Sequence, residues 1–200
     1  MAYNNCFVLK ENLERVRERI AAAARRAGRD PAGIDLLCVT KGVPVERVRE
    51  AAAAGVTEVG ENRVQEAQAK RPALDDVLLR WHLVGHLQRN KAKFAVQLFD
   101  VIHSVDSLEL IEALEQQMAL RSAQGERRLE VFLQVNVSGE ATKHGCKPGE
   151  AEALAKAMLK ASHLKWAGLM TMAPPPAVGP QGLPPEAGPA SPGAAGGGGG

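Results

Sequence analysis

Apolar residues recur along the first part of the chain in two alternating patterns. One is a short continuous apolar run, as in IDLLCVTK at 34–41, which is typical of a buried strand. The other is an apolar spacing of three and four residues, as from Leu9 to Ala24, which predicts an amphipathic helix that Gly28 ends. Further strands are predicted at 56–60, 81–86, 99–107, 129–138 and 165–173, and further helices at 45–54, 61–71, 90–98, 108–121 and 150–161.

The regular alternation of strand and helix indicates an α/β fold with parallel strands and crossover helices. A doubly wound sheet and a (β/α)8 barrel of the TIM type both accommodate about six such units. We favour the barrel, because polar residues gather at or just past the C-terminal ends of the strands, where barrel active sites are built. These residues are Lys41, Glu61, Asn62, His86, Ser104, Asn136, Ser138 and Thr171.

The last 27 residues differ in composition from the rest. From Pro174 to Gly200, 17 of 27 residues are proline or glycine, and Glu186 carries the only charge. Such a segment cannot bury enough apolar surface to offset the entropy lost on ordering it. We therefore expect one barrel domain at 1–173 and a disordered tail at 174–200.

Composition narrows the class of protein. Of 200 residues 45 % are hydrophobic and 24 % charged, as in a globular protein, and the net charge of +2 gives no reason to expect nucleic acid or a membrane as partner. Cys6, Cys38 and Cys146 are odd in number and widely spaced, which favours a reducing compartment. The N-terminus lacks a signal-peptide pattern, and no apolar run approaches the roughly 20 residues that span a bilayer. We expect a cytoplasmic protein.

Lys41 directly follows the first predicted strand. We expect its side chain to point into the mouth of the sheet among apolar neighbours, where desolvation lowers the pKa of a lysine from about 10.4. A neutral amine can form a Schiff base with an aldehyde. Without further context, Lys41 is better explained as a surface lysine whose side chain extends from the strand end into water.

The surroundings of Lys41 change that interpretation. Six motifs occur in order: LLCVTKGVP (36–44), GENRVQE (60–66), WHLVGHLQRNK (81–91), HSVDS (103–107), QVNVSGEATKHG (134–145) and GLMTMAP (168–174). Together they resemble the pyridoxal phosphate homeostasis protein family from about Leu9 to Pro174. The resemblance implies a single (β/α)8 barrel similar to the N-terminal domain of alanine racemase. It also implies that pyridoxal 5′-phosphate is held as a Schiff base on Lys41, without known catalytic turnover, in a protein that supplies the cofactor to dependent apoenzymes.

The resemblance places four further residues around the cofactor: Asn62, His82, Asn136 and Met170. Asn62 also fits a helix N-cap, and Asn136 and Met170 also fit core positions. His82 fits a packed imidazole as well as one near the cofactor. His82 and His86 do not predict a metal site, because their spacing suits zinc only on a helix and no cysteine or carboxylate near them in sequence completes a site. The segment 138–145 resembles a lid over the barrel mouth, and its composition fits a solvated turn equally well.

The sequence departs from the family pattern after the sixth strand. Members continue with two strand–helix units that carry a Ser-Met-Gly-Met-Ser turn and an Arg-Ile-Gly segment, which bind the phosphate group, and neither motif occurs here. We therefore expect a C-terminally incomplete barrel. One alternative function is thus a binding-impaired form of such a protein. The other, an amino-acid racemase, requires a catalytic tyrosine from an additional domain, and the only tyrosine here is Tyr3.

Overall fold

The computed structural model describes residues 2–122, 128–140 and 142–173, and the predicted tail at 174–200 lies outside this part. Its sheet has six strands in the described residues, all pairs are parallel, and their spatial order is the chain order from β1 to β6. The strands are β1 (Cys38–Val39), β2 (Glu58–Glu61), β3 (Arg80–Leu83), β4 (Val101–Val105), β5 (Leu129–Gln134) and β6 (Leu164–Met170).

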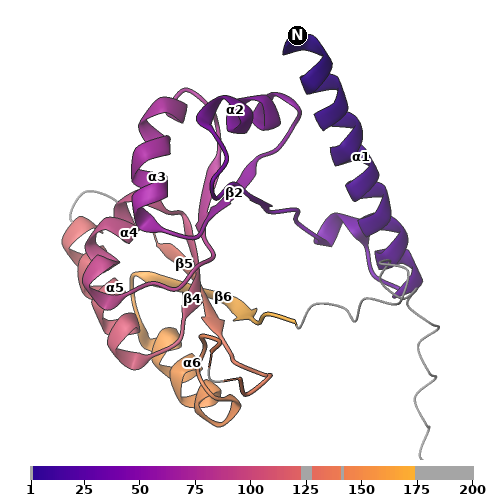
Figure 1. The fold of residues 1–200 in the computed structure, drawn as a ribbon. Coiled ribbons are helices and arrows are strands. Elements are labelled where there is room, and N and C mark those ends of the chain that lie inside the picture. Colours follow the sequence, from indigo (N-terminus) through magenta and orange to yellow (C-terminus); the bar gives the residue numbers. More distant parts are fainter. Residues whose placement is uncertain (1, 123–127, 141, 174–200) are drawn as a thin grey trace, which may run out of the picture.

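The strand order decides between the two predicted architectures. A doubly wound sheet reverses its strand order at a switch point, whereas a barrel keeps each strand next to the one that precedes it. The uninterrupted order from β1 to β6 confirms the barrel type. Among the described residues β1 and β6 each pair on one side only, so the sheet is open between them (Figure 1).

The helices lie mostly on the outer, convex side of the curved sheet (Figure 1). They are α1 (Ala2–Arg26), α2 (Val45–Ala53), α3 (Val64–Lys70), α4 (Ala92–Leu98), α5 (Leu108–Ser122) and α6 (Ala151–Lys160). Short 3-10 turns occur at η1 (Pro31–Gly33), η2 (Arg71–Leu74), η3 (Arg89–Lys91) and η4 (Pro148–Glu150). Helices α2 to α6 surround the sheet, while α1 stands apart on the β1 side.

The main core fills the space between the sheet and these helices. Val59, Leu83, Ile102 and Leu133 come from four successive strands, and each is fully buried. They belong to one apolar cluster that includes residues of α4, α5 and α6. Because side chains alternate along a strand, the neighbours of these residues face the inside of the barrel. Residues of a functional site are therefore expected among those inward-facing neighbours and at the strand ends.

Helix α1 carries the predicted apolar spacing and buries part of it. Leu13 and Ala24 are buried, whereas Val16 is 39 % exposed. The helix is tied to the rest of the chain by Arg17, whose Nη2 donates to the carbonyl of Gly55 at 2.8 Å. Gly28, with φ at 66°, ends the helical run as predicted, because glycine reaches this left-handed conformation without strain.

The first strand is shorter than predicted. The sequence indicated a strand over 34–41, but only Cys38 and Val39 form the ladder, and the amide of Thr40 extends it by one bond to Gly60. An edge strand with one neighbour has fewer ladder bonds to hold it, which accounts for the difference. None of the helices described here is long and apolar enough to cross a lipid bilayer.

Candidate functional site

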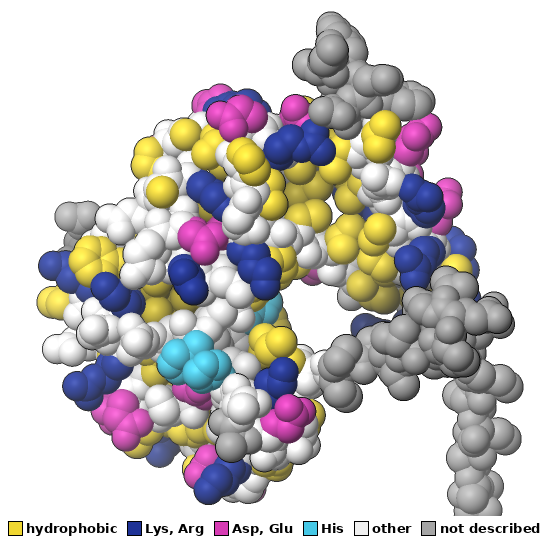
Figure 2. Space-filling view, in the orientation of Figure 1, with side chains coloured by type: hydrophobic (Ala, Val, Ile, Leu, Met, Phe, Trp, Pro, Cys, Tyr) yellow, Lys and Arg dark blue, Asp and Glu magenta, His cyan; other side chains and the backbone are white. Residues whose placement is uncertain are grey.

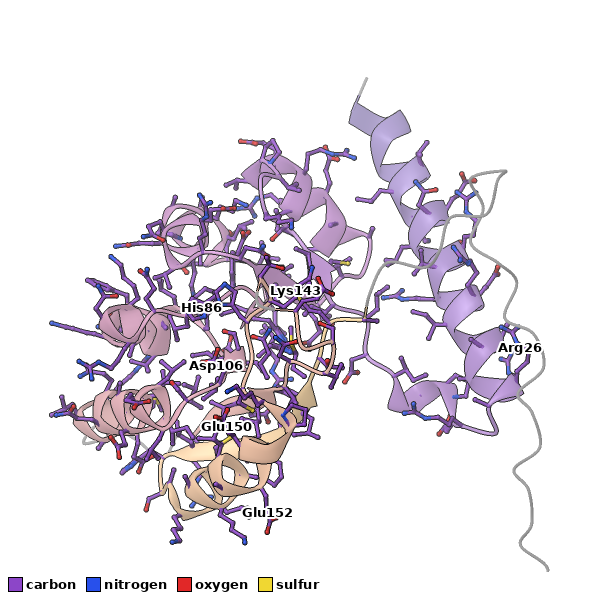
Figure 3. The ribbon with its side chains drawn as sticks, turned by 60° about the horizontal axis from the view of Figure 1, so that its bottom comes forward. Arg26, His86, Asp106, Lys143, Glu150 and Glu152 are labelled. Carbon is purple, nitrogen blue, oxygen red and sulfur yellow. The ribbon has the colours of Figure 1, made fainter. Side chains whose placement is uncertain are left out.

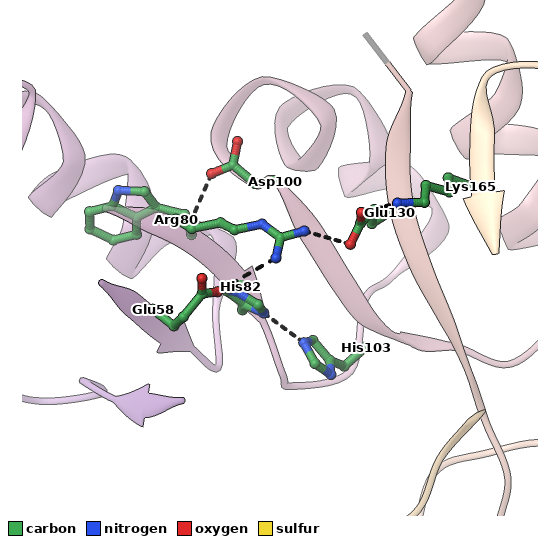
Figure 4. A network of polar contacts seen from close by, with 8 residues as sticks. Glu58, Arg80, His82, Asp100, His103, Glu130 and Lys165 are labelled. Atoms are coloured by element: carbon green, nitrogen blue, oxygen red, sulfur yellow. Dashed lines mark hydrogen bonds and ion pairs between the residues drawn. The ribbon is translucent and has the colours of Figure 1, made fainter. Parts of the chain in front are cut away.

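The inner face of the sheet carries a polar network near the strand starts (Figure 4). Arg80 donates to Glu130 at 2.5 Å and lies 3.8 Å from Glu58, while Lys165 donates to Glu130 at 2.7 Å. Burial alone would raise the pKa of Glu130, but the hydrogen bonds from Lys165 and Arg80 outweigh it and the pKa is lowered. These charges neutralise one another across β2, β3, β5 and β6.

Two imidazoles continue this network deeper into the barrel. Nδ1 of His82 lies 2.8 Å from Nε2 of His103, and Nε2 of His82 bonds to Glu58. Burial lowers the pKa of both histidines, to about 4 for His103, so both rings are neutral near pH 7. With neutral rings, His82 donates to Glu58 and accepts from His103, whose ring also stacks on Phe132 at 4.6 Å.

The prediction of a packed His82 is therefore confirmed: its side chain is buried and both ring nitrogens have partners. Its contact with a cofactor stays a prediction. Asp100 joins the same region by accepting the amide of Trp81 at 2.8 Å. These contacts tie the strand starts to one another and stabilise the barrel at the end opposite its carboxyl-terminal face.

Lys41 lies on that face, directly after Thr40 at the end of β1. Its side chain is exposed, so the predicted desolvation by apolar neighbours is wrong. The reason is the edge position of β1, because no described strand lies on its other side to cover the lysine. Its backbone is nevertheless fixed, since Thr40 bonds to Gly60 on one side of it and Gly42 donates to Glu66 at 3.2 Å on the other.

A second lysine, Lys70 on α3, lies beside the same turn. Its Nζ donates to the Thr40 carbonyl at 2.7 Å and to the buried carboxylate of Glu61 at 2.8 Å. The Thr40 hydroxyl donates to the same Glu61 oxygen at 2.7 Å. Lys41, by contrast, has no side-chain hydrogen bond or ion pair to another described residue. Of these two neighbouring lysines, Lys70 therefore has a structural role, whereas the amine of Lys41 is available to bind a ligand.

Asn62 directly follows β2. It lies next to Lys41, because the paired parallel strands β1 and β2 end at the same edge of the sheet. It does not cap the following helix: the N-cap is Arg63, so the predicted capping role is wrong. The reason is that β2 runs on through Glu61, which delays the start of α3 to Val64. A Cβ at Gly85 would stand 2.2 Å from the carbonyl oxygen of Asn62, so only glycine lets these two strand ends meet.

Asn136 and Met170 lie together at the other edge of the sheet. Met170 ends β6 opposite Gln134, and its carbonyl accepts the amide of Val135 at 2.9 Å. The side chain of Asn136 is engaged within its own loop: Nδ2 donates to the carbonyls of Glu140 and Lys143, and Oδ1 accepts from Ser138 and Gly139. Asn136 therefore shapes the segment that was predicted to resemble a lid.

Three residues of the carboxyl-terminal face form a cluster that the sequence did not reveal. His86 follows β3, Asp106 follows β4, and His144 lies in the segment after β5. The prediction that no carboxylate lies near His86 is wrong in space, although it holds in sequence. Ser104 was counted among the strand-end groups, but it lies within β4, fully buried, and its hydroxyl has no partner among the described residues.

Comparisons with known proteins agree with this architecture. The family model described as alanine racemase, N-terminal domain, matches residues 11–177. A pyridoxal phosphate homeostasis protein from Pseudomonas aeruginosa is 46 % identical over 169 residues, which are 84 % of this chain and 72 % of that protein. A crystal structure of an unknown protein from Bifidobacterium adolescentis has a TM-score of 0.76 at 33 % identity and covers 84 % of this chain and 70 % of its own.

A further solved structure carries a ligand. It is PipY of Synechococcus elongatus, whose title records bound PLP, and it matches with a TM-score of 0.65 at 39 % identity, covering 80 % of this chain and 71 % of that one.

Proposed function

This chain belongs to the pyridoxal phosphate homeostasis protein family, and on that premise we propose that it binds pyridoxal 5′-phosphate covalently on Lys41 and acts in cofactor homeostasis without catalytic turnover. The observation that carries the proposal is the contrast between two neighbouring lysines. Lys70 is held by Glu61 and Thr40, whereas the exposed amine of Lys41 has no described partner.

The residues around Lys41 fit the aldehyde end of this cofactor. When bound, the cofactor supplies an aldehyde carbon that forms a carbon–nitrogen double bond with an amine and releases water. The chain's part is to present that amine at a fixed place. The turn from Thr40 to Gly42 is tied to both β2 and α3, so Nζ of Lys41 extends from a rigid base beside Asn62.

The described residues offer fewer groups that could bind the phosphate end of the cofactor. The two motifs that the family resemblance assigns to phosphate binding do not occur in the sequence. A hollow beside Asn62 offers positive charge and amide groups, but also the carboxylate of Glu66. Its other polar lining residues are Arg63, Gln65, His86, Gln88 and Lys91. We therefore propose that this chain binds the cofactor, but more weakly than a family member that carries both phosphate motifs.

An absorption titration tests the binding proposal. Adding pyridoxal 5′-phosphate to the chain should shift the cofactor spectrum toward that of an imine, saturating at one cofactor per chain. Lys41→Arg keeps the positive charge but lacks the nucleophile, so the shift should disappear. Lys160→Arg, at the exposed lysine that ends α6, is the matched control and should titrate like the original chain. An unchanged titration in Lys41→Arg contradicts the proposal.

The absence of turnover needs its own test. A racemase needs a second acid–base group opposite the lysine, and the side chain of the only tyrosine, Tyr3, lies outside the described residues. We expect the loaded chain to exchange the α-hydrogen of alanine for deuterium far more slowly than the roughly 1–10³ s⁻¹ typical of enzymes. Exchange within that range, lost in Lys41→Ala, would show that the protein is an enzyme.

A further inference from the structure

We propose that His86, Asp106 and His144 form a binding site for one divalent transition-metal cation, with Zn²⁺ as the representative ion. The three side chains offer two imidazole nitrogens and one carboxylate oxygen, and these ligand atoms all lie within 4.8 Å of one another. None of the three residues is needed to hold the amine of Lys41 in place, but His86 also lines the hollow beside Asn62, so the metal is titrated without pyridoxal phosphate.

The three residues come from three successive strand ends, so the barrel itself brings them together. His86 lies after β3, Asp106 directly after β4, and His144 in the segment that returns to β5. In Figure 3, His86 and Asp106 lie close to each other on the same side of the molecule. His86 and His144 are both exposed, and Figure 2 shows histidine side chains at the surface of the molecule.

The backbone holds His86 and His144 firmly in place. His86 follows Gly85, which packs against the Asn62 carbonyl. The carbonyl of His144 accepts a hydrogen bond from Nε2 of the buried Gln134 at 3.1 Å. Gly145 has φ at 120°, and a Cβ there would stand 2.7 Å from the Asn136 amide, so the turn after His144 is also fixed. Ligand residues on such supports lose little entropy when they bind an ion.

The side chains converge without bonding to one another. Nδ1 of His86 lies 3.9 Å from Oδ2 of Asp106, which is too far for a hydrogen bond. The rings of His86 and His144 stack in parallel, with centroids 4.0 Å apart. No hydrogen bond between any two of the three side chains is present among the described residues. Three ligand atoms that face one another without hydrogen bonds among them leave room for a cation between them.

The chemistry of the donors selects the class of cation. Two imidazoles and one carboxylate match the ligand set of zinc sites that keep an open position for water. Magnesium and calcium prefer oxygen ligands throughout, so they should bind poorly. A tetrahedral zinc site places its ligand atoms about 3.4 Å apart. Because His86 and His144 are exposed, their rings can rotate out of the stack to reach that spacing.

Cys146 lies near this cluster but is not assigned to it. Its Sγ is not among the ligand atoms that lie within 4.8 Å of one another. Its amide donates to Gln134 and its carbonyl accepts from Asn136, so the residue serves to anchor the segment that carries His144.

Calorimetric titration of the full chain with Zn²⁺, in the absence of pyridoxal phosphate, tests the site. We expect one ion per chain, no competition by Mg²⁺, and dissociation constants raised more than about tenfold in His86→Ala and in His144→Ala, since losing even an outer partner of a metal ligand commonly costs that much. His163→Gln is the control, because His163 precedes β6 at the opposite end of the barrel and pairs with Glu115.

Several results would overturn the assignment. They are failure of the original chain to bind Zn²⁺ one to one, undiminished binding in the double variant His86→Ala/His144→Ala, and an equal loss in His163→Gln. A thiolate-to-metal charge-transfer band in the Co²⁺ complex, abolished by Cys146→Ser, would likewise overturn the three-donor site. Because His86 and His144 are exposed, both variants should melt like the original chain, and His86→Gln and His144→Gln repeat the test with less loss of volume.

Discussion

Nζ of Lys70 lies 2.8 Å from Oε1 of Glu61, a carboxylate whose side chain is completely buried. The pair joins α3 to the end of β2, and both residues also bond to Thr40, the residue before Lys41. The turn that carries the proposed cofactor lysine thus rests on a buried ion pair.

Removing one member of this pair should be costly. Lys70→Met leaves the Glu61 carboxylate buried and unpaired, and we expect a loss of about 3 kcal/mol in the free energy of unfolding, measured by urea denaturation. Lys156→Met is the matched control, because Lys156 pairs with Glu152 at a similar distance in an exposed position, and it should cost less than about 0.5 kcal/mol. Equal losses in the two variants would show that the buried pair of Lys70 and Glu61 contributes no more to stability than an exposed ion pair.

The contact between Gly85 and Asn62 gives a second prediction. Gly85→Ala places a Cβ against the Asn62 backbone, which must move, so we expect a loss of about 1–3 kcal/mol in urea denaturation together with weaker cofactor binding. Gly149→Ala is the control, because a Cβ there meets nothing within 4 Å. A Gly85→Ala variant as stable as Gly149→Ala would mean that the two strand ends separate easily.

The buried histidines predict a pH dependence of stability. The pKa of His103 is about 4 in the folded chain against an ordinary value of 6.5, so between these values the unfolded chain binds more protons. Stability should therefore fall as the pH is lowered from about 6.5 toward 4. Glu130, whose pKa is lowered from 4.5, loses its contribution only at more acidic pH.

Comparing urea midpoints at pH 7 and pH 5 isolates the histidine effect. In His103→Gln the difference between the two midpoints should shrink, because the residue that resists protonation is gone. His163→Gln should retain the difference, since it changes a histidine outside the inner network. An identical difference in the original chain and in His103→Gln would contradict the assignment of a neutral, buried His103.

The open edges of the sheet predict that added strands will stabilise the chain. Val39 on β1 and Leu169 on β6 are 47 % and 64 % exposed at edges that have no described partner. Fusing two C-terminal strand–helix units of a family member after Ala173 should raise the melting temperature by at least about 5 °C and tighten cofactor binding. A glycine–serine segment of equal length is the control, and equal effects of the two fusions would refute the prediction.

The sequence predicted the larger features of the fold well. Each predicted strand and helix has a counterpart, because apolar periodicity and glycine stops are local signals. The boundaries were less certain: β2 runs on through Glu61, which the pattern placed in the following helix. From the sequence alone, Glu61 fits a helix better than a buried strand. Only the structure shows that Lys70 pairs with it and allows its burial.

The candidate site was predicted less completely than the fold. The motif placed Lys41 and Asn62 at adjacent strand ends, as observed, but the exposure of Lys41 depends on the missing neighbour of β1, which no local pattern reports. His86, Asp106 and His144 are separated by 20 and 38 residues in the sequence, so only the barrel brings them together. The search for polar residues at the strand ends found His86, but it missed Asp106, because the pattern placed Asp106 inside the strand predicted at 99–107, whereas β4 ends at Val105.

The central claim is that Lys41 carries the cofactor, and borohydride trapping tests it most directly. The chain is incubated with pyridoxal 5′-phosphate, reduced with borohydride and digested, and the modified lysine is identified by mass spectrometry. The account predicts the phosphopyridoxyl group on Lys41, undiminished in Lys160→Arg and absent in Lys41→Ala. Modification centred on Lys70 or another lysine, or a yield unchanged in Lys41→Ala, would contradict it.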